Sequence, residues 1–113
     1  MLELSEANLE ESLAQIERPV LALLYADWCL FSRSFKHSFH EATKENNAVE
    51  FALTDISDEE NMLWERYSIQ TVPTLLLFHK GKLIQRVDGN PGEGLQNSSI
   101  EDMRRIVKSL PRP

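Results

Sequence analysis

The sequence predicts an α/β domain in which a mixed β-sheet is flanked by helices on both faces. Two uninterrupted apolar runs, Val20–Ala26 and Thr74–Phe78, show no polar alternation, which is typical of strands covered on both sides. Segments with helical spacing of apolar residues separate the predicted strands. The turn Lys80-Gly81-Lys82 directly after the second run predicts an antiparallel hairpin. Parallel crossovers followed by a hairpin give the element order β-α-β-α-β-α-β-β-α.

Length and composition indicate one domain that spans residues 1–113. A chain of 113 residues with 42% apolar residues buries about two-thirds of its surface without disulfide or metal staples. One cysteine excludes an intrachain disulfide framework and a cysteine-based zinc site. The net charge of -6 argues against a nucleic-acid partner, which needs a cationic face. The acidic start lacks a signal-peptide pattern, and no apolar run approaches the ~20 residues of a membrane span. We therefore expect a soluble, cytoplasmic protein with no membrane partner.

The first half of the chain is predicted to hold two strands and two helices. Residues 1–4 favour a short edge strand, and Ser5 is a candidate N-cap for the helix that follows. Arg18-Pro19 ends that helix, because the residue before a proline is disfavoured in the α region. After the first apolar run, a helix is predicted from Leu30 to about Glu45. The apolar stripe of this second helix consists of Phe31, Phe35, Phe39 and Ala42.

The second half adds three strands and two helices. Alternating apolar residues predict a strand over residues 49–55, and Asp58 is a candidate N-cap for a helix that ends near Ser68. Leu83–Val87 forms the second arm of the hairpin. Ser98 and Glu101 have the spacing of a capping box at the start of the last helix. The apolar face of this last helix consists of Ile100, Met103, Ile106, Val107 and Leu110.

The single cysteine is the strongest candidate for chemistry. Cys29 directly follows a predicted buried strand and opens a helix. The free N–H groups and partial positive charge of a helix N-terminus favour a thiolate over a thiol. Ser32, three residues later, is placed to hydrogen-bond the sulfur. The residues alone leave open the alternative of a buried, inert cysteine. They likewise leave open an ordinary trans bond at Val72-Pro73, because cis occurs in only about 5–6% of X–Pro bonds.

Three segments together resemble the thioredoxin family. They are Tyr25-Ala-Asp-Trp-Cys29, Glu65-Arg-Tyr-Ser-Ile69 and Val72-Pro-Thr-Leu-Leu-Leu-Phe78 followed by Lys80-Gly81, and the match runs from about Leu2 to Gly89. The resemblance implies the thioredoxin fold and a cis Val72–Pro73 peptide beside the cysteine. In the family this loop offers backbone groups to an extended substrate segment. The resemblance implies a catalytic role for Cys29 and Ser32 and substrate binding by Trp28, Leu30, Phe31, Val72 and Pro73. Trp64 is interpreted as helix packing.

The sequence departs from the family pattern at its reactive centre. The family's Trp-Cys-Gly-Pro-Cys is here Trp28-Cys-Leu-Phe-Ser32, so a serine replaces the resolving cysteine. The family's buried acid falls on Leu23, its partner lysine falls near Leu53, and its helix-kinking proline falls on His37. The second thiol and the groups that move its proton are therefore missing together. A serine introduced to trap complexes would give the same sequence.

These departures predict thiol–disulfide exchange through Cys29 alone, as in a monothiol protein-disulfide oxidoreductase or isomerase. Its substrates would be protein disulfides or thiols, and glutathione or another small thiol would clear the mixed disulfide. We expect no cofactor, and a monomer or weak homodimer. No metal site is expected, because His37 and His40 have no third ligand. The alternative is a redox-silent adaptor that binds polypeptides in the cis-proline groove. The bulky Leu30-Phe31 pair favours this alternative, and the retained cysteine favours exchange.

Overall fold

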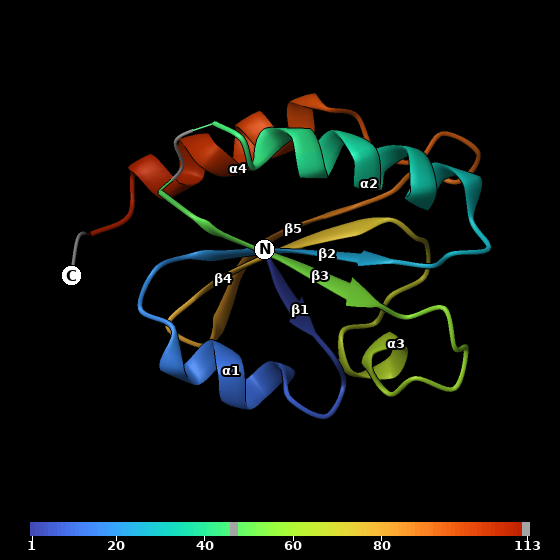
Figure 1. Cartoon of the computed structure of the whole chain (residues 1–113), viewed down its shortest axis with the longest axis horizontal. Helices are drawn as coiled ribbons and strands as arrows, with labels where there is room; N and C mark the ends of the chain where they lie inside the picture. The colour runs from blue at the N-terminus through green and yellow to red at the C-terminus, as the bar shows by residue number, and fades with distance from the viewer. Residues whose placement is uncertain (46–47, 112–113) are drawn as a thin grey trace.

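A five-stranded mixed sheet forms the centre of the protein (Figure 1). The computed structural model describes residues 1–45 and 48–111. The strand order is β1-β3-β2-β4-β5, in which β1 and β2 run parallel to β3. The fourth strand runs antiparallel to both β2 and β5. The strands are β1 (Leu2–Leu4), β2 (Val20–Tyr25), β3 (Glu50–Asp55), β4 (Thr74–His79) and β5 (Lys82–Asp88).

Helices cover both faces of the sheet. Figure 1 shows α2 and α4 on one face and α1 and α3 on the other. The element order is the predicted one, and the fold class is confirmed. The helices are α1 (Leu9–Gln15), α2 (Leu30–Ala42), α3 (Leu63–Arg66) and α4 (Ser98–Lys108). Among the described residues, none of the helices has the length and apolar character needed to cross a membrane.

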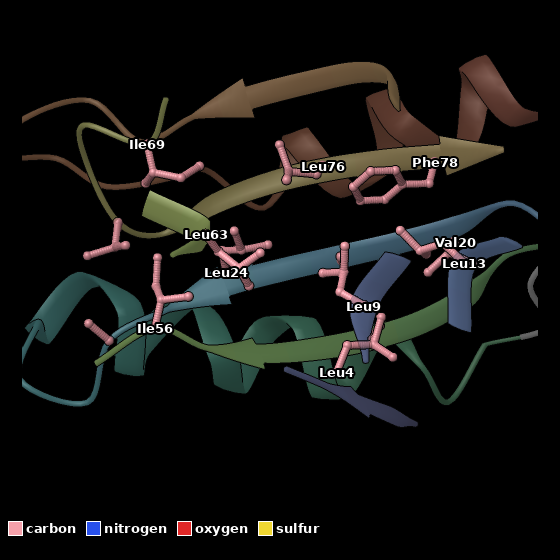
Figure 2. Packing of buried hydrophobic residues seen from close by; sticks show 14 residues of the cluster. Leu4, Leu9, Leu13, Val20, Leu24, Ile56, Leu63, Ile69, Leu76 and Phe78 are labelled. Carbon is pink, nitrogen blue, oxygen red and sulfur yellow. The ribbon is translucent and has the colours of Figure 1, made fainter. Parts of the chain in front are cut away.

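Two apolar cores sandwich the sheet. Figure 2 shows the first core, in which leucines of α1 and α3 gather with side chains of the central strands. The second core joins the sheet to α2 and α4, where Phe39 meets Phe51 edge to face at 5.1 Å between ring centroids. All six residues of β2 are buried because their side chains alternate between these two cores. This double burial is the reason that the sequence of β2 shows no polar alternation.

Leu23 lies in the dry interior of the second core. The side chain is fully buried, and its neighbours in register on the adjacent strands are Leu53 and Leu75. All three residues belong to or pack against the core under α2 and α4. The positions that carry the family's buried acid and partner lysine therefore hold apolar side chains in contact with apolar surroundings.

The predicted helix caps are wrong in three places. Asn8 is the N-cap of α1, and its Oδ1 accepts the Ser5 N–H at 2.7 Å, so Ser5 precedes the helix. Asp58 instead accepts the Glu60 N–H at 2.9 Å in a turn before α3. The Ser98–Glu101 capping box is not formed, because α4 begins at Ser98 itself and Glu101 pairs with Arg104. Both α1 and α4 thus begin without a side-chain cap, and backbone bonds close their first turns, such as Leu9 N–H to the Ser5 carbonyl at 2.9 Å and Ile100 N–H to the Asn97 carbonyl at 3.1 Å.

The second helix ends earlier than predicted. It stops at Ala42 rather than near Glu45, and Thr43 is its C-cap. The Thr43 Oγ1 donates to the His40 carbonyl at 2.7 Å, and its N–H is bonded to carbonyls of the last turn. These bonds satisfy carbonyls that a longer helix would use, which explains the early end.

Substitution of Leu23 tests whether water reaches the core under α2 and α4. We expect Leu23→Asn to lower the free energy of unfolding by roughly 3 kcal/mol at any mildly acidic or neutral pH, because a polar group enters the core. Leu23→Asp should cost a similar amount at about pH 4 and more at about pH 7. Burial raises the pKa of the introduced carboxyl, so the folded state keeps its proton while the unfolded state loses it above about pH 4.

Urea unfolding of both variants at the two pH values measures the difference. A penalty for Leu23→Asp that does not change with pH would mean that the carboxyl reaches water. That result would contradict the description of this position as a dry one.

Candidate active site

Cys29 lies at the end of the turn that connects β2 to α2. The strand ends at Tyr25, and the Cys29 N–H closes the intervening turn by donating to the Ala26 carbonyl at 3.1 Å. Cys29 is the N-cap of α2, and its carbonyl accepts the Arg33 N–H at 3.1 Å. The thiol is partly exposed, and its Sγ lies 3.5 Å from the Val72 carbonyl oxygen. The sulfur therefore lies at the start of a helix and is partly open to solvent.

Ser32 does not make the hydrogen bond to the sulfur that the sequence predicted. Its side chain is fully buried in the first turn of α2, and its Oγ accepts the Ala26 N–H at 3.3 Å. The expected hydrogen bond to sulfur is replaced by the contact between Cys29 and the Val72 carbonyl. The reason is geometric, because the Ser32 side chain points inward to the end of β2. Ser32 thus satisfies a backbone donor beneath the reactive sulfur.

The loop that faces the sulfur is held by hydrogen bonds on both sides of a cis Val72–Pro73 peptide. Thr71 Oγ1 donates to the Gly89 carbonyl at 2.6 Å, and the Gly89 N–H donates to the Pro73 carbonyl at 3.0 Å. A Cβ on Gly89 would lie 2.6 Å from the Pro73 oxygen, closer than real Cβ atoms come. Glycine is therefore required for this close approach, which fixes Val72 beside Cys29.

A pair of stacked tryptophans builds one wall of the site. The rings of Trp28 and Trp64 are nearly parallel, with centroids 6.4 Å apart and an interplanar angle of 7°. The indole N–H of Trp28 donates to the Ser57 carbonyl at 2.9 Å. The indole N–H of Trp64 donates to the carbonyls of Ile56 at 2.9 Å and Asp58 at 3.2 Å. Both rings are thus tied to the segment after β3, so Trp64 belongs to the site as well as to the packing of α3.

An open groove of about 520 Å³ runs past the sulfur. Of the predicted site residues, Trp28, Cys29, Phe31 and Val72 line it. Leu30 is 66% exposed and Pro73 is buried, and neither residue lines the groove. Seven further residues that were not among the predicted site residues line the groove, and they come from α3 and from several loops: Glu59, Trp64, Gln70, Thr71, Asn90, Pro91 and Gly92.

The two histidines on α2 lie outside this groove. His37 and His40 are exposed, and their near neighbour Glu41 is hydrogen-bonded to Lys44, which lowers the pKa of the Glu41 carboxyl. Within residues 1–45 and 48–111, no group of three or more His, Cys, Asp or Glu side chains is arranged to hold a metal ion.

Replacement of Ser32 separates its structural role from a chemical one. We expect Ser32→Ala to lower the free energy of unfolding by about 1–2 kcal/mol, because the buried Ala26 N–H loses its acceptor. Ser34→Ala, an exposed change on the same helix, is the matched control and should have little effect. Chemical denaturation of both variants gives the comparison. Equal stability of the two variants would contradict the assigned hydrogen bond.

Replacement of Gly89 tests the support of the loop. We expect Gly89→Ala to destabilise the protein by at least about 2 kcal/mol, because the new methyl group collides with the Pro73 carbonyl. It should also slow alkylation of Cys29, whose neighbour Val72 moves with the loop. Gly92→Ala is the control, because a Cβ there meets nothing within 4 Å and only its φ of 76° opposes the change. A Gly92→Ala penalty as large as that of Gly89→Ala would contradict the steric argument.

Comparison with known proteins supports the same arrangement. The thioredoxin family model matches residues 1–101. Thioredoxin C-3 of Corynebacterium nephridii is 30% identical over 88 residues, which cover 78% of this chain and 60% of that protein. Human endoplasmic reticulum resident protein 44 is 37% identical over 90 residues, which cover 74% of this chain and 22% of that protein. The chain thus spans less than two-thirds of the length of these relatives.

A solved structure extends the comparison to the whole chain. Thioredoxin f2 of Chlamydomonas reinhardtii superposes with a TM-score of 0.82 over 99% of each chain, at 17% sequence identity. At that identity the likeness establishes the fold alone. The family model, however, covers most of the sequence, including the cysteine and the cis-proline loop. The chain therefore belongs to the thioredoxin family.

Proposed function

We propose that the protein carries out thiol–disulfide exchange through Cys29 as a single nucleophile. The Cys29 thiolate attacks one sulfur of a target disulfide, and the other target sulfur leaves as a thiolate. One S–S bond forms as one breaks, so the step needs no external oxidant or reductant. The product is a mixed disulfide between Cys29 and the target.

The observation that carries this proposal is a partly exposed thiol at a helix N-terminus with no second thiol beside it. Ser32 occupies the place of the family's resolving cysteine, and it is fully buried and bonded to the Ala26 N–H. A serine hydroxyl cannot displace a target from sulfur. An outside thiol, such as glutathione or the target's own second cysteine, would therefore complete the reaction. This chemistry suits isomerisation or retention of a thiol partner better than net reduction.

The groove supports a polypeptide as the substrate. The Val72 carbonyl faces the reacting sulfur, as a backbone group that pairs with an extended chain would. The tryptophan pair and Phe31 offer apolar surface in the same groove as Cys29. The cytoplasmic location and the monomeric or weakly dimeric state remain predictions.

A second candidate is a redox-silent adaptor that binds polypeptides in the same groove. The observation that favours it is the apolar rim, in which Leu30 is 66% exposed, Trp28 57% and Phe31 38%. Such a patch is typical of a binding surface. The adaptor would bind targets equally well without the sulfur, and this property separates the two candidates.

Intact-mass analysis with a disulfide-containing protein tests the proposal. Wild-type protein should gain one target subunit through a reducible bond, and Cys29→Ser should gain none. Binding of the same target by Cys29→Ser with unchanged affinity, and no covalent adduct in the wild type, would support the adaptor and contradict exchange.

Restoration of a second thiol tests the missing half of the reaction. We expect Ser32→Cys to form an intrachain disulfide with Cys29, because the Cys-x-x-Cys spacing at a helix start brings the two Cβ atoms into range. Turnover of insulin disulfides should stay at least about tenfold below that of an ordinary thioredoxin, because Leu23 offers no group to accept the proton of the buried thiol. Added Leu23→Asp should recover part of this deficit. Insulin reduction at the full thioredoxin rate by Ser32→Cys alone would contradict the account.

A further inference from the structure

Glu59 is the one charged side chain among the residues that line the groove. Its neighbours in the lining are aromatic, aliphatic or uncharged polar residues. Glu59 is exposed, and the described part of the chain offers it no ion-pair partner. Arg33 begins the next turn after Cys29, but it does not line the groove. Apart from the reacting sulfur itself, Glu59 is therefore the negative charge that the groove lining presents to an incoming substrate.

The tryptophan pair holds the segment that carries this charge. Indole N–H groups are bonded to the carbonyls of the three residues that precede Glu59, namely Ile56, Ser57 and Asp58. The Asp58 carboxylate also accepts the Glu60 N–H at 2.9 Å, which closes the turn around Glu59. Glu59 is thus presented from an anchored turn, at the same wall that carries the aromatic rings.

The negative charge of Glu59 and the aromatic surface of the tryptophan pair together favour a positively charged side chain on the target. A Lys or Arg side chain next to the target cysteine would meet the Glu59 carboxylate and the faces of an electron-rich indole pair. An acidic side chain at the same place would be repelled, and the net charge of -6 adds a weaker repulsion from the rest of the surface.

We propose that the groove selects target polypeptides whose disulfide is flanked by Lys or Arg, and that Glu59 is the specificity-determining residue. This inference rests on the proposed function. The Cys29 thiolate attacks one sulfur of the target disulfide, and the other sulfur of that disulfide departs as a thiolate. The charge preference is measured as a difference in the rate of this exchange between targets. The preference acts on the approach and alignment of the target.

Three disulfide-linked peptide dimers of equal length provide the test, with Lys, Gln or Glu on both sides of the cysteine. The rate of mixed-disulfide formation is measured for the full chain and divided by the rate for 2-mercaptoethanol, which removes the effect of the flanking charges on the peptide disulfide itself. We expect the Lys peptide to exceed the Glu peptide about tenfold at about 20 mM salt, and the ratio to fall in about 0.5 M salt.

Two variants that each remove one negative charge test whether the preference for Lys depends on Glu59 or on the net charge of the protein. Glu59→Gln should reduce the Lys-to-Glu ratio about threefold. Glu17→Gln removes the same charge from an exposed position before β2, at the opposite end of the strand from Cys29, and should leave the ratio unchanged.

Each remaining outcome counts against the inference. A normalised ratio near one in the wild type would overturn it while leaving the exchange reaction in place. An equal effect of both variants would assign the preference to net charge and remove Glu59 from its role. Failure of the neutral Gln peptide to react at all would contradict the proposed function, and the selectivity with it.

Discussion

Burial of β2 on both faces is the constraint on which the rest of the structure depends. A core on each side fixes the strand along its whole length, so the turn after Tyr25 delivers Cys29 to one place at the start of α2. The same burial leaves Leu23 in an apolar interior, where a carboxylate would be costly.

The walls of the groove depend on a different kind of interaction. Hydrogen bonds between Gly89, Thr71 and Pro73 hold the cis-proline loop, and indole N–H groups hold the segment after β3. These hydrogen bonds hold the backbone of both walls in place. The groove therefore keeps its shape although much of its apolar surface is open to solvent.

The fold could be predicted from the sequence because its signals are long and periodic. The continuous apolar run of β2 and the helical stripe of α2 report burial directly, so element order and sheet type followed from them. Helix starts at Ser5 and Ser98 were wrong because backbone carbonyls, rather than serine side chains, accept the N–H groups of the first turns, and a difference of one bond moves a cap.

The site was predictable only in part, for a related reason. Cys29 and Val72 lie in contiguous motifs, and the structure brings them to 3.5 Å between the sulfur and the carbonyl oxygen. Glu59, from the turn after β3, and Trp64, from α3, join them through tertiary packing, which leaves no spacing in the sequence. Ser32 was placed in the right turn with the wrong partner, because its inward direction depends on how α2 lies against the end of β2.

The central claim is that Cys29 forms a mixed disulfide that the protein cannot resolve by itself. The lifetime of a purified Cys29–peptide adduct, followed by intact mass with and without glutathione, measures this most directly. The account predicts an adduct that persists for hours when no thiol is added and is cleared within minutes by millimolar glutathione, on the order of exchange with a free thiol. Rapid release of the peptide without any added thiol would contradict it.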